Sequence, residues 1–197
     1  MILDRLSKPA AAFLALSALL SLVGCAGPEA PGAREMSPTA TGGQTRAELI
    51  STLDGMAGLS FSGVGGSEPN VKGNTGFTFQ VRLDPEYVLV DPAGLVEFLA
   101  ESAWSVNDDP MPNTSVEINY TGAPGDQLDL AAVAGAEGWL SPSGGGIGVA
   151  ANGFSRVVIP VSDSAVEKGV PENLDRLGDW PGVVPETPSD LVAPRVD

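Results

Sequence analysis

Apolar and polar residues follow two different periods along the middle of the chain. After Thr45, apolar residues recur at the spacing of one helix face, at Leu49, Ile50, Leu53 and Met56. Between residues 77 and 83 they alternate strictly with polar residues, which is typical of a strand with one buried and one solvated face. The two periods take turns up to residue 161 and therefore predict a domain of mixed helices and strands.

Helical spacing and capping signals together predict three helices. Residues 45–48 form a capping box, which predicts a helix over residues 46–56. The pair Asp91-Pro92 places a capping carboxylate before a proline suited to a first helical turn, so a second helix is expected there. We expect Asp126 to cap a third helix that ends at Gly138.

Four strands are expected, over residues 59–62, 77–83, 116–120 and 154–161. The first two should form a hairpin with a long loop. Pro160 in the last strand cannot donate to a ladder, which favours a sheet edge. Half-solvated strands between one-sided helices predict an α+β fold, a two-layer sandwich with about three helices on one face of a four-stranded sheet. A ferredoxin-like topology is our first expectation for the strand order.

The first 24 residues have the layout of an export signal. Arg5 and Lys8 precede a run of fourteen uncharged and mostly apolar residues, 10–23. This run is shorter than the roughly 20 residues that a helix needs to cross a bilayer core. We therefore expect residues 1–24 to be a signal peptide rather than a transmembrane span.

The sole cysteine of the chain follows this run directly, in the sequence Leu22-Val23-Gly24-Cys25. These residues resemble the lipobox of bacterial lipoproteins, and the whole chain resembles the uncharacterised small lipoproteins of high-GC Gram-positive bacteria. The resemblance implies cleavage before Cys25, attachment of fatty acyl chains such as palmitate, and a lipid-anchored protein on the extracytoplasmic face of the cell membrane. The alternatives are an ordinary secretory signal with an incidental cysteine, or a buried core thiol.

The predicted domain covers residues 45–164. The segments before and after it lack apolar periodicity. Residues 25–44, from the lipidated cysteine onward, are rich in Gly, Pro, Ala, Ser and Thr and are predicted to be a flexible tether. Residues 165–197 are acidic and proline-rich, so we expect a disordered tail. Alternatively, residues 179–188 (DWPGVVPETP) are a docking peptide with Trp180 as its anchor.

Composition excludes several classes of function. With 25 acidic against 10 basic residues, the net charge is −15, which disfavours nucleic acid and anionic lipid surfaces as partners. The chain has no histidine, and its one cysteine is assigned to the lipid anchor. Imidazole or thiol catalysis and zinc sites built from histidine or cysteine are therefore excluded, and no cofactor is expected.

Two groups of residues could carry chemistry, but each has a plainer interpretation. Residues 107–109, Asn-Asp-Asp, offer oxygen ligands for a weak calcium site, yet the prolines that follow favour a solvated turn. Trp104 and Trp139 could form a sugar-binding wall beside paired carboxylates, the hydrolytic device that this composition permits. Both lie at the ends of predicted helices, which favours core packing.

Three further features are interpreted as structural. The glycine-rich residues 143–148 lack the lysine and following helix of a phosphate loop and are predicted to be a flexible connection. Lys72 lies among Gly, Ser and Asn and should be an exposed amine, not the partner of a catalytic serine. The solvated sheet face shows no aromatic ring of the kind that stacks on RNA, and is expected to carry Ser60, Ser62, Thr78, Gln80, Arg82, Glu117, Asn119 and Arg156.

These observations favour a non-enzymatic binding or structural module of the cell envelope. One alternative is a carboxylate-dependent hydrolase that acts on envelope glycans. The other is an accessory subunit of an envelope transport or secretion machine, in which the acidic surface meets a basic partner. No catalytic, cofactor-binding or metal-binding residue is assigned, and Cys25, as the lipidation site, is the one site residue predicted.

Overall fold

The computed structural model describes residues 42–141, 152–161 and 172–196. The predicted signal peptide, Cys25 and most of the tether lie outside the described residues, as does the glycine-rich run at 143–148.

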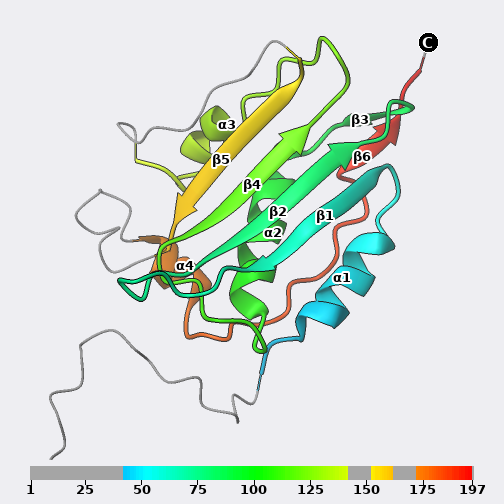
Figure 1. Ribbon diagram of the computed structural model, residues 1–197. Coiled ribbons are helices and arrows are strands. Elements are labelled where there is room, and N and C mark those ends of the chain that lie inside the picture. Colours follow the sequence, from blue (N-terminus) through cyan, green and yellow to red (C-terminus); the bar gives the residue numbers. More distant parts are fainter. Residues whose placement is uncertain (1–41, 142–151, 162–171, 197) are drawn as a thin grey trace, which may run out of the picture. The chain divides into compact units, whose positions relative to one another are not determined.

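Four strands form the central sheet in the spatial order β1-β2-β4-β5 (Figure 1). They are β1 (Leu59–Gly66), β2 (Gly76–Leu83), β4 (Ser115–Thr121) and β5 (Phe154–Pro160). β1 pairs antiparallel with β2, β2 parallel with β4, and β4 antiparallel with β5. The predicted hairpin is confirmed, and so is the edge position of the strand that contains Pro160.

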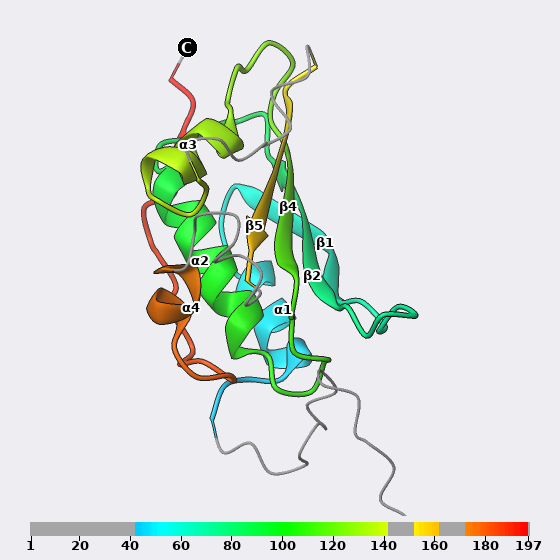
Figure 2. The ribbon, with the colours of Figure 1, turned by 90° about the vertical axis from the view of Figure 1, so that its left-hand side faces the viewer.

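The described helices lie on one side of this sheet, which Figure 2 shows nearly edge-on. They are α1 (Arg46–Asp54), α2 (Pro92–Ser105), α3 (Leu130–Ala136) and α4 (Glu172–Leu177). The inward residues of the strands, such as Phe79 and Ile118, pack against the apolar residues of α2 in one buried cluster. The prediction of a two-layer α+β sandwich is confirmed.

The strand order differs from the expected ferredoxin-like topology. That topology arranges its elements as β-α-β-β-α-β and separates the parallel strands of each unit. Here the sheet begins with a hairpin, and α2 is the crossover that parallel neighbours require. Because β1 already occupies one side of β2, β4 adds on the other side as its direct neighbour.

Two of the three predicted helix caps are confirmed. The Glu48 amide donates to Thr45 Oγ1 over 3.2 Å, and the Thr45 amide donates to Glu48 Oε2 over 2.8 Å, which completes the capping box of α1. At the start of α2, the Gly94 amide donates to Asp91 Oδ1 over 2.9 Å. α1 ends at Asp54, two residues before the predicted end.

The third cap prediction, Asp126, is wrong. α3 starts four residues later, and Asp129 accepts from the amides of Ala131 and Ala132 at 3.0 and 3.1 Å. Asp126 instead accepts from the Ala123 amide over 2.9 Å, in the turn after β4. Aspartate suits both a turn and a helix start, and the spacing of apolar residues alone did not separate the two positions.

The prediction of a disordered tail is wrong for residues 172–196. This segment contains α4 and a short strand, β6 (Val192–Pro194), which pairs antiparallel with β3 (Tyr87–Leu89), another strand that the pattern did not predict. Leu177 and Leu191 are buried in the main core. A few buried apolar residues therefore anchor this segment to the core, although its average composition is typical of a disordered segment.

The proposed docking peptide lies against its own domain. The Trp104 side chain donates through Nε1 to the Gly178 carbonyl over 3.1 Å, and the Gly182 amide donates to the Trp104 carbonyl over 3.1 Å. Trp180 is half-buried against the same core. Trp180 and Gly182 thus pack within the chain in this structure, whereas Val183 and Val184 of the same segment are exposed.

Replacing Leu191 by alanine should test whether the C-terminal segment belongs to the core. Leu191 is 2% exposed and packs near Gly94 at the start of α2. Its truncation should lower the free energy of unfolding by about 3 kcal/mol, measured by urea denaturation. The control Val183→Ala, at a position that is 89% exposed in the same segment, should leave stability unchanged. Equal stability of the two variants would contradict the packing described here.

Candidate functional site

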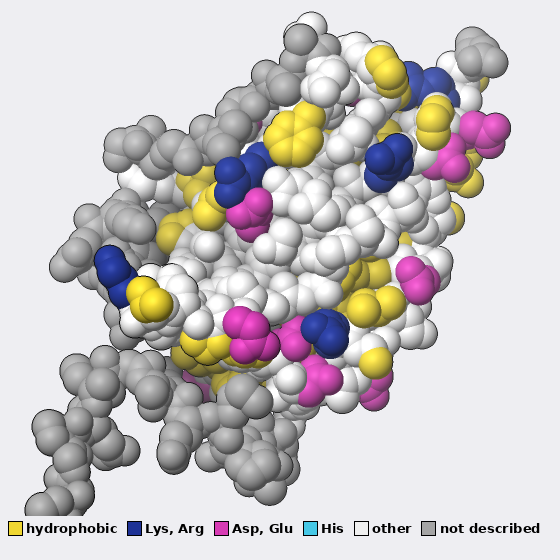
Figure 3. Space-filling model, in the orientation of Figure 1, with side chains coloured by type: hydrophobic (Ala, Val, Ile, Leu, Met, Phe, Trp, Pro, Cys, Tyr) yellow, Lys and Arg dark blue, Asp and Glu magenta, His cyan; other side chains and the backbone are white. Residues whose placement is uncertain are grey.

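The face of the sheet that the helices leave uncovered is polar. It faces the viewer in Figure 3, where most of it carries neither hydrophobic nor charged side chains. The strand register places Gln80 beside Asn119, and Asn119 beside Arg156, in one row across three strands. The residues predicted for this face therefore come together as the sequence pattern indicated.

Glu117 lies on the same face, two residues before Asn119 on β4, and its carboxylate is paired. Arg156 Nη2 donates to Glu117 Oε2 over 2.7 Å, and Asn119 Nδ2 donates to Oε1 over 2.8 Å. Burial by itself raises the pKa of Glu117, but these hydrogen bonds outweigh it and lower the pKa below its usual value. The carboxylate is thus held ionised beside a shallow groove of about 420 Å³ lined mainly by hydroxyl and amide side chains.

The expectation that this face carries no aromatic ring is wrong. Phe154 lies opposite Thr121, which in turn lies opposite Arg82. The next residue, Ser155, is fully buried on the helix side, so Phe154 faces outward, and it is half-buried. A single ring is less than an RNA-binding sheet presents for stacking on two or three bases, and the absence of a nucleic-acid partner stays a prediction.

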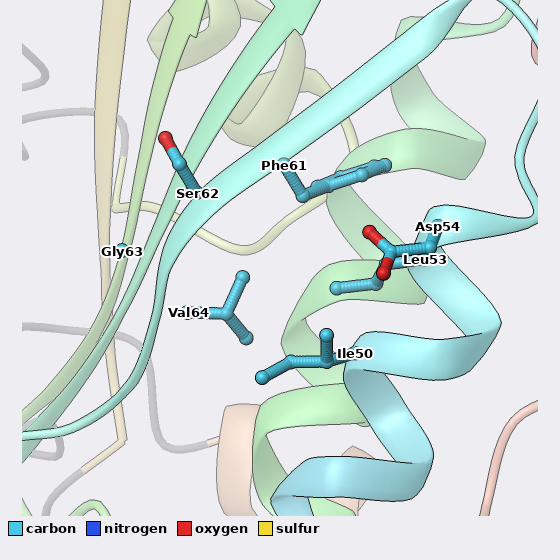
Figure 4. A pocket seen from close by; sticks show the side chains of 7 residues that line it. All are labelled: Ile50, Leu53, Asp54, Phe61, Ser62, Gly63 and Val64. Carbon is cyan, nitrogen blue, oxygen red and sulfur yellow. The ribbon is translucent and has the colours of Figure 1, made fainter.

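A second candidate surface is a crevice between α1 and β1 (Figure 4). We refer to it as the α1–β1 crevice, with a volume of about 240 Å³, and it is lined by Ile50, Leu53, Asp54, Phe61, Ser62, Gly63 and Val64. In Figure 4, Phe61 and Val64 extend from β1 toward α1, whereas Ser62 points the other way. Its walls are therefore mostly apolar, with the carboxylate of Asp54 at one end.

A β-bulge builds this crevice. In a regular strand, side chains three positions apart point to opposite faces, yet Phe61 and Val64 both point toward α1. The register of β1 against β2 shifts between Ser62 and Gly65, and Gly63 has a φ of +56°, which favours glycine. The extra residue re-aims Val64 into the crevice. The predicted strand covered only the alternating residues 59–62, although glycines that follow such a run can also signal a bulge within a longer strand.

Residues 107–109 join the start of the domain to its body. Asn107 Nδ2 donates to the Gly42 carbonyl over 2.8 Å, and the Asn107 amide donates to the Gln44 carbonyl over 2.9 Å. The Gln44 amide donates to the Ser105 carbonyl over 2.8 Å. The last residues of the predicted tether are thus fixed to the end of α2.

The two aspartates of this stretch hold α1 against β1. Asp108 Oδ1 accepts from the Arg46 amide over 2.7 Å at the start of α1. Asp109 accepts from the Gly66 amide over 2.8 Å and from the Arg46 guanidinium over 3.4 Å. Their oxygens serve this junction, and among the described residues no group of three or more potential ligand side chains could hold a metal ion.

The remaining candidates have the structural roles expected of them. Trp104 and Trp139 are buried in the core, which confirms core packing and leaves no exposed sugar-binding wall at these positions. The Arg176 guanidinium stacks over the Trp139 ring, 3.8 Å from its centroid. Lys72 is exposed in a turn, as predicted.

Comparisons with known proteins give no relative for this chain. No family model matches it, and neither a curated protein nor a solved structure shows a significant match. Within the described residues, no helix combines the length and the apolar character needed to span a membrane.

Asp109→Ala should weaken the junction between α1 and β1. The change leaves the Gly66 amide without its acceptor, so we expect a loss of about 1–3 kcal/mol in the free energy of unfolding by urea denaturation. The control Asp54→Ala removes an acid from the same region. The Asp54 carboxylate accepts no hydrogen bond from the described residues, so its loss should have little effect on the free energy of unfolding. Calcium and a chelator should give equal melting temperatures; stabilisation by calcium that Asp109→Ala abolishes would instead indicate a metal site.

Glu117→Gln should alter how stability depends on pH. Because the pKa of Glu117 is lower in the folded than in the unfolded protein, its stabilising contribution is present above its ordinary pKa of 4.5 and is lost as the pH falls further. The difference in unfolding free energy between wild type and Glu117→Gln should therefore shrink from about pH 6 to about pH 3. In an Arg156→Met background this pH dependence should be weaker, and a difference that stays constant with pH in the wild-type background would contradict the pairing.

Proposed function

We propose that this protein is a lipid-anchored binding module on the extracytoplasmic face of the cell membrane, and not an enzyme. The observation that carries the proposal is the lone cysteine at the end of an export-signal pattern, Leu22-Val23-Gly24-Cys25. Two or more acyl chains hold a protein at a membrane far more firmly than a single chain does. The acidic chain needs such an anchor, because its charge is repelled by anionic lipid surfaces.

The length of chain before the domain supports display away from the membrane. Gly42 is the first described residue, and its carbonyl accepts a hydrogen bond from Asn107. The next residue along, Asp108, accepts from the Arg46 amide at the start of α1, so the chain enters the domain at this point. Sixteen residues separate Cys25 from Gly42, enough for a reach of at most about 60 Å. A domain on such a connection can meet partners beyond the lipid headgroups.

The chemistry of the described hollows supports binding over hydrolysis. A glycoside hydrolase places two carboxyl groups across one bond, and its general acid has a raised pKa. The α1–β1 crevice and the groove beside Glu117 each contain one acid, and the pKa of Glu117 is lowered. Burial, and then the nearby Glu97, raise the pKa of Glu101, but Glu101 lies on α2 and lines neither hollow. An accessory subunit of a transport or secretion machine is one form that such a binding module could take.

Cys25→Ser should release the protein from the membrane. Without the thiol there is no attachment point for acyl chains, so the variant should move from the membrane pellet to the soluble fraction after cell fractionation. Ser37→Ala, a small change between Cys25 and the domain, should leave the protein in the pellet and still labelled when cells grow with an alkyne-tagged palmitate. A Cys25→Ser protein that remains in the pellet, or wild-type protein with a free thiol and an intact leader, would rule out the anchor.

A further inference from the structure

We propose that the free edge of β1 and the α1–β1 crevice together bind an extended, basic peptide segment of a partner protein. The segment adds a strand beside β1 and places one apolar side chain in the crevice. This inference rests on the proposed binding function and names the surface and the chemistry of the partner.

β1 provides an unpaired edge. It is the outermost strand on its side of the sheet, and no described segment pairs with its outer edge. The amide and carbonyl groups along such an edge are a template for another extended chain. The opposite edge is less suitable, because β5 contains Pro160 and packs against α3. β1 contains no proline.

The crevice beside this edge has the size and polarity for one side chain. Its volume of about 240 Å³ lies below the range of about 300–1,000 Å³ for pockets that take drug-sized molecules. Ile50 on its rim is 37% exposed, and Phe61 and Val64 are half-buried, so apolar surface remains available to a partner. Every second side chain of a strand added to β1 would point to this side of the sheet.

The bulge limits how much of the edge is used. Pairing is regular over residues 59–62 and is interrupted at Gly63. Bulges of this kind protect exposed edges against indiscriminate pairing. A partner therefore gains only a few backbone hydrogen bonds, and the side chain in the crevice supplies the selectivity.

Charge decides between a foreign peptide and a second copy of the chain. Asp54 lies at the crevice, Glu48 is exposed on α1, and Glu68 is exposed just beyond β1. A second copy brings the same net charge of −15 to this edge and is repelled. Lysine or arginine residues flanking the apolar side chain would instead meet these carboxylates with complementary charge.

Peptide binding to the purified lipidated protein in nonionic detergent micelles tests the inference. The probe is a fluorescent peptide in which lysines alternate with threonines around one central leucine, and its affinity is measured by fluorescence anisotropy. We expect saturable binding that weakens at least tenfold when alternate backbone nitrogens of the peptide are methylated, because strand addition needs those amides. A peptide of the same composition in scrambled order should also bind at least tenfold more weakly.

The variant Ile50→Asp distinguishes peptide binding in the crevice from non-specific electrostatic attraction to the acidic protein. It makes the protein more acidic, so a purely electrostatic association with the basic peptide would tighten, whereas loss of the apolar rim should weaken binding at least tenfold. The control Val71→Asp makes the same charge change at a fully exposed loop position and should not weaken binding. Circular dichroism melting checks that Ile50→Asp is folded; if it is not, Ile50→Ser should weaken binding in the same direction.

Unchanged or tighter binding by folded Ile50→Asp, or equal binding of the scrambled peptide, would overturn the inference. A dimer in analytical ultracentrifugation that Ile50→Asp dissociates would also overturn it, since the occupant would then be a second copy. Failure of the proposed function is separate, because it shows as membrane retention of Cys25→Ser whatever the affinity for the peptide.

Discussion

The packing of α2 against the inner face of the sheet is the interaction on which the rest of the structure depends. α2 is buried along most of its length and provides the crossover that makes β2 and β4 parallel neighbours. Its first turn is covered by Leu191, and its last turn bonds the start of the domain through the Ser105 carbonyl. Trp104 near the same end receives the C-terminal segment. Segments from both ends of the described chain are therefore organised around one helix.

The sequence pattern predicted the elements whose stability is local or periodic. The alternation in β2 and β4 follows directly from a sheet with one buried face, and the capping box at Thr45 depends only on residues within one turn. The structure of the C-terminal segment, in contrast, depends on contacts with distant parts of the chain. Leu177 and Leu191 lie outside any long periodic run of apolar residues, and their burial depends on surfaces that those distant parts form. Periodicity carries no information about such long-range contacts.

The two candidate surfaces differ in the same way. The polar sheet face was predictable, because it is the outward half of an alternating pattern. The α1–β1 crevice was not, because it exists only where a bulge turns Val64 toward α1. A glycine-rich stretch suits a loop, a bulge or a close backbone approach, and only the register against β2 decides among them. Cys25 is a different case, since its prediction comes from a processing motif and concerns a residue outside the described structure.

The excess of acidic residues links the proposed anchor to the proposed partner. A strongly acidic domain gains no attraction from an anionic membrane surface, so the membrane retention that we propose depends on acyl chains. The same charge opposes pairing between copies of the chain when they are crowded on one membrane, even though β1 leaves an edge open. It does not oppose a basic segment. In the function and the partner that we propose, the open strand edge of an acidic domain therefore selects its partners by charge first, and the apolar crevice beside it then selects among basic segments by side chain.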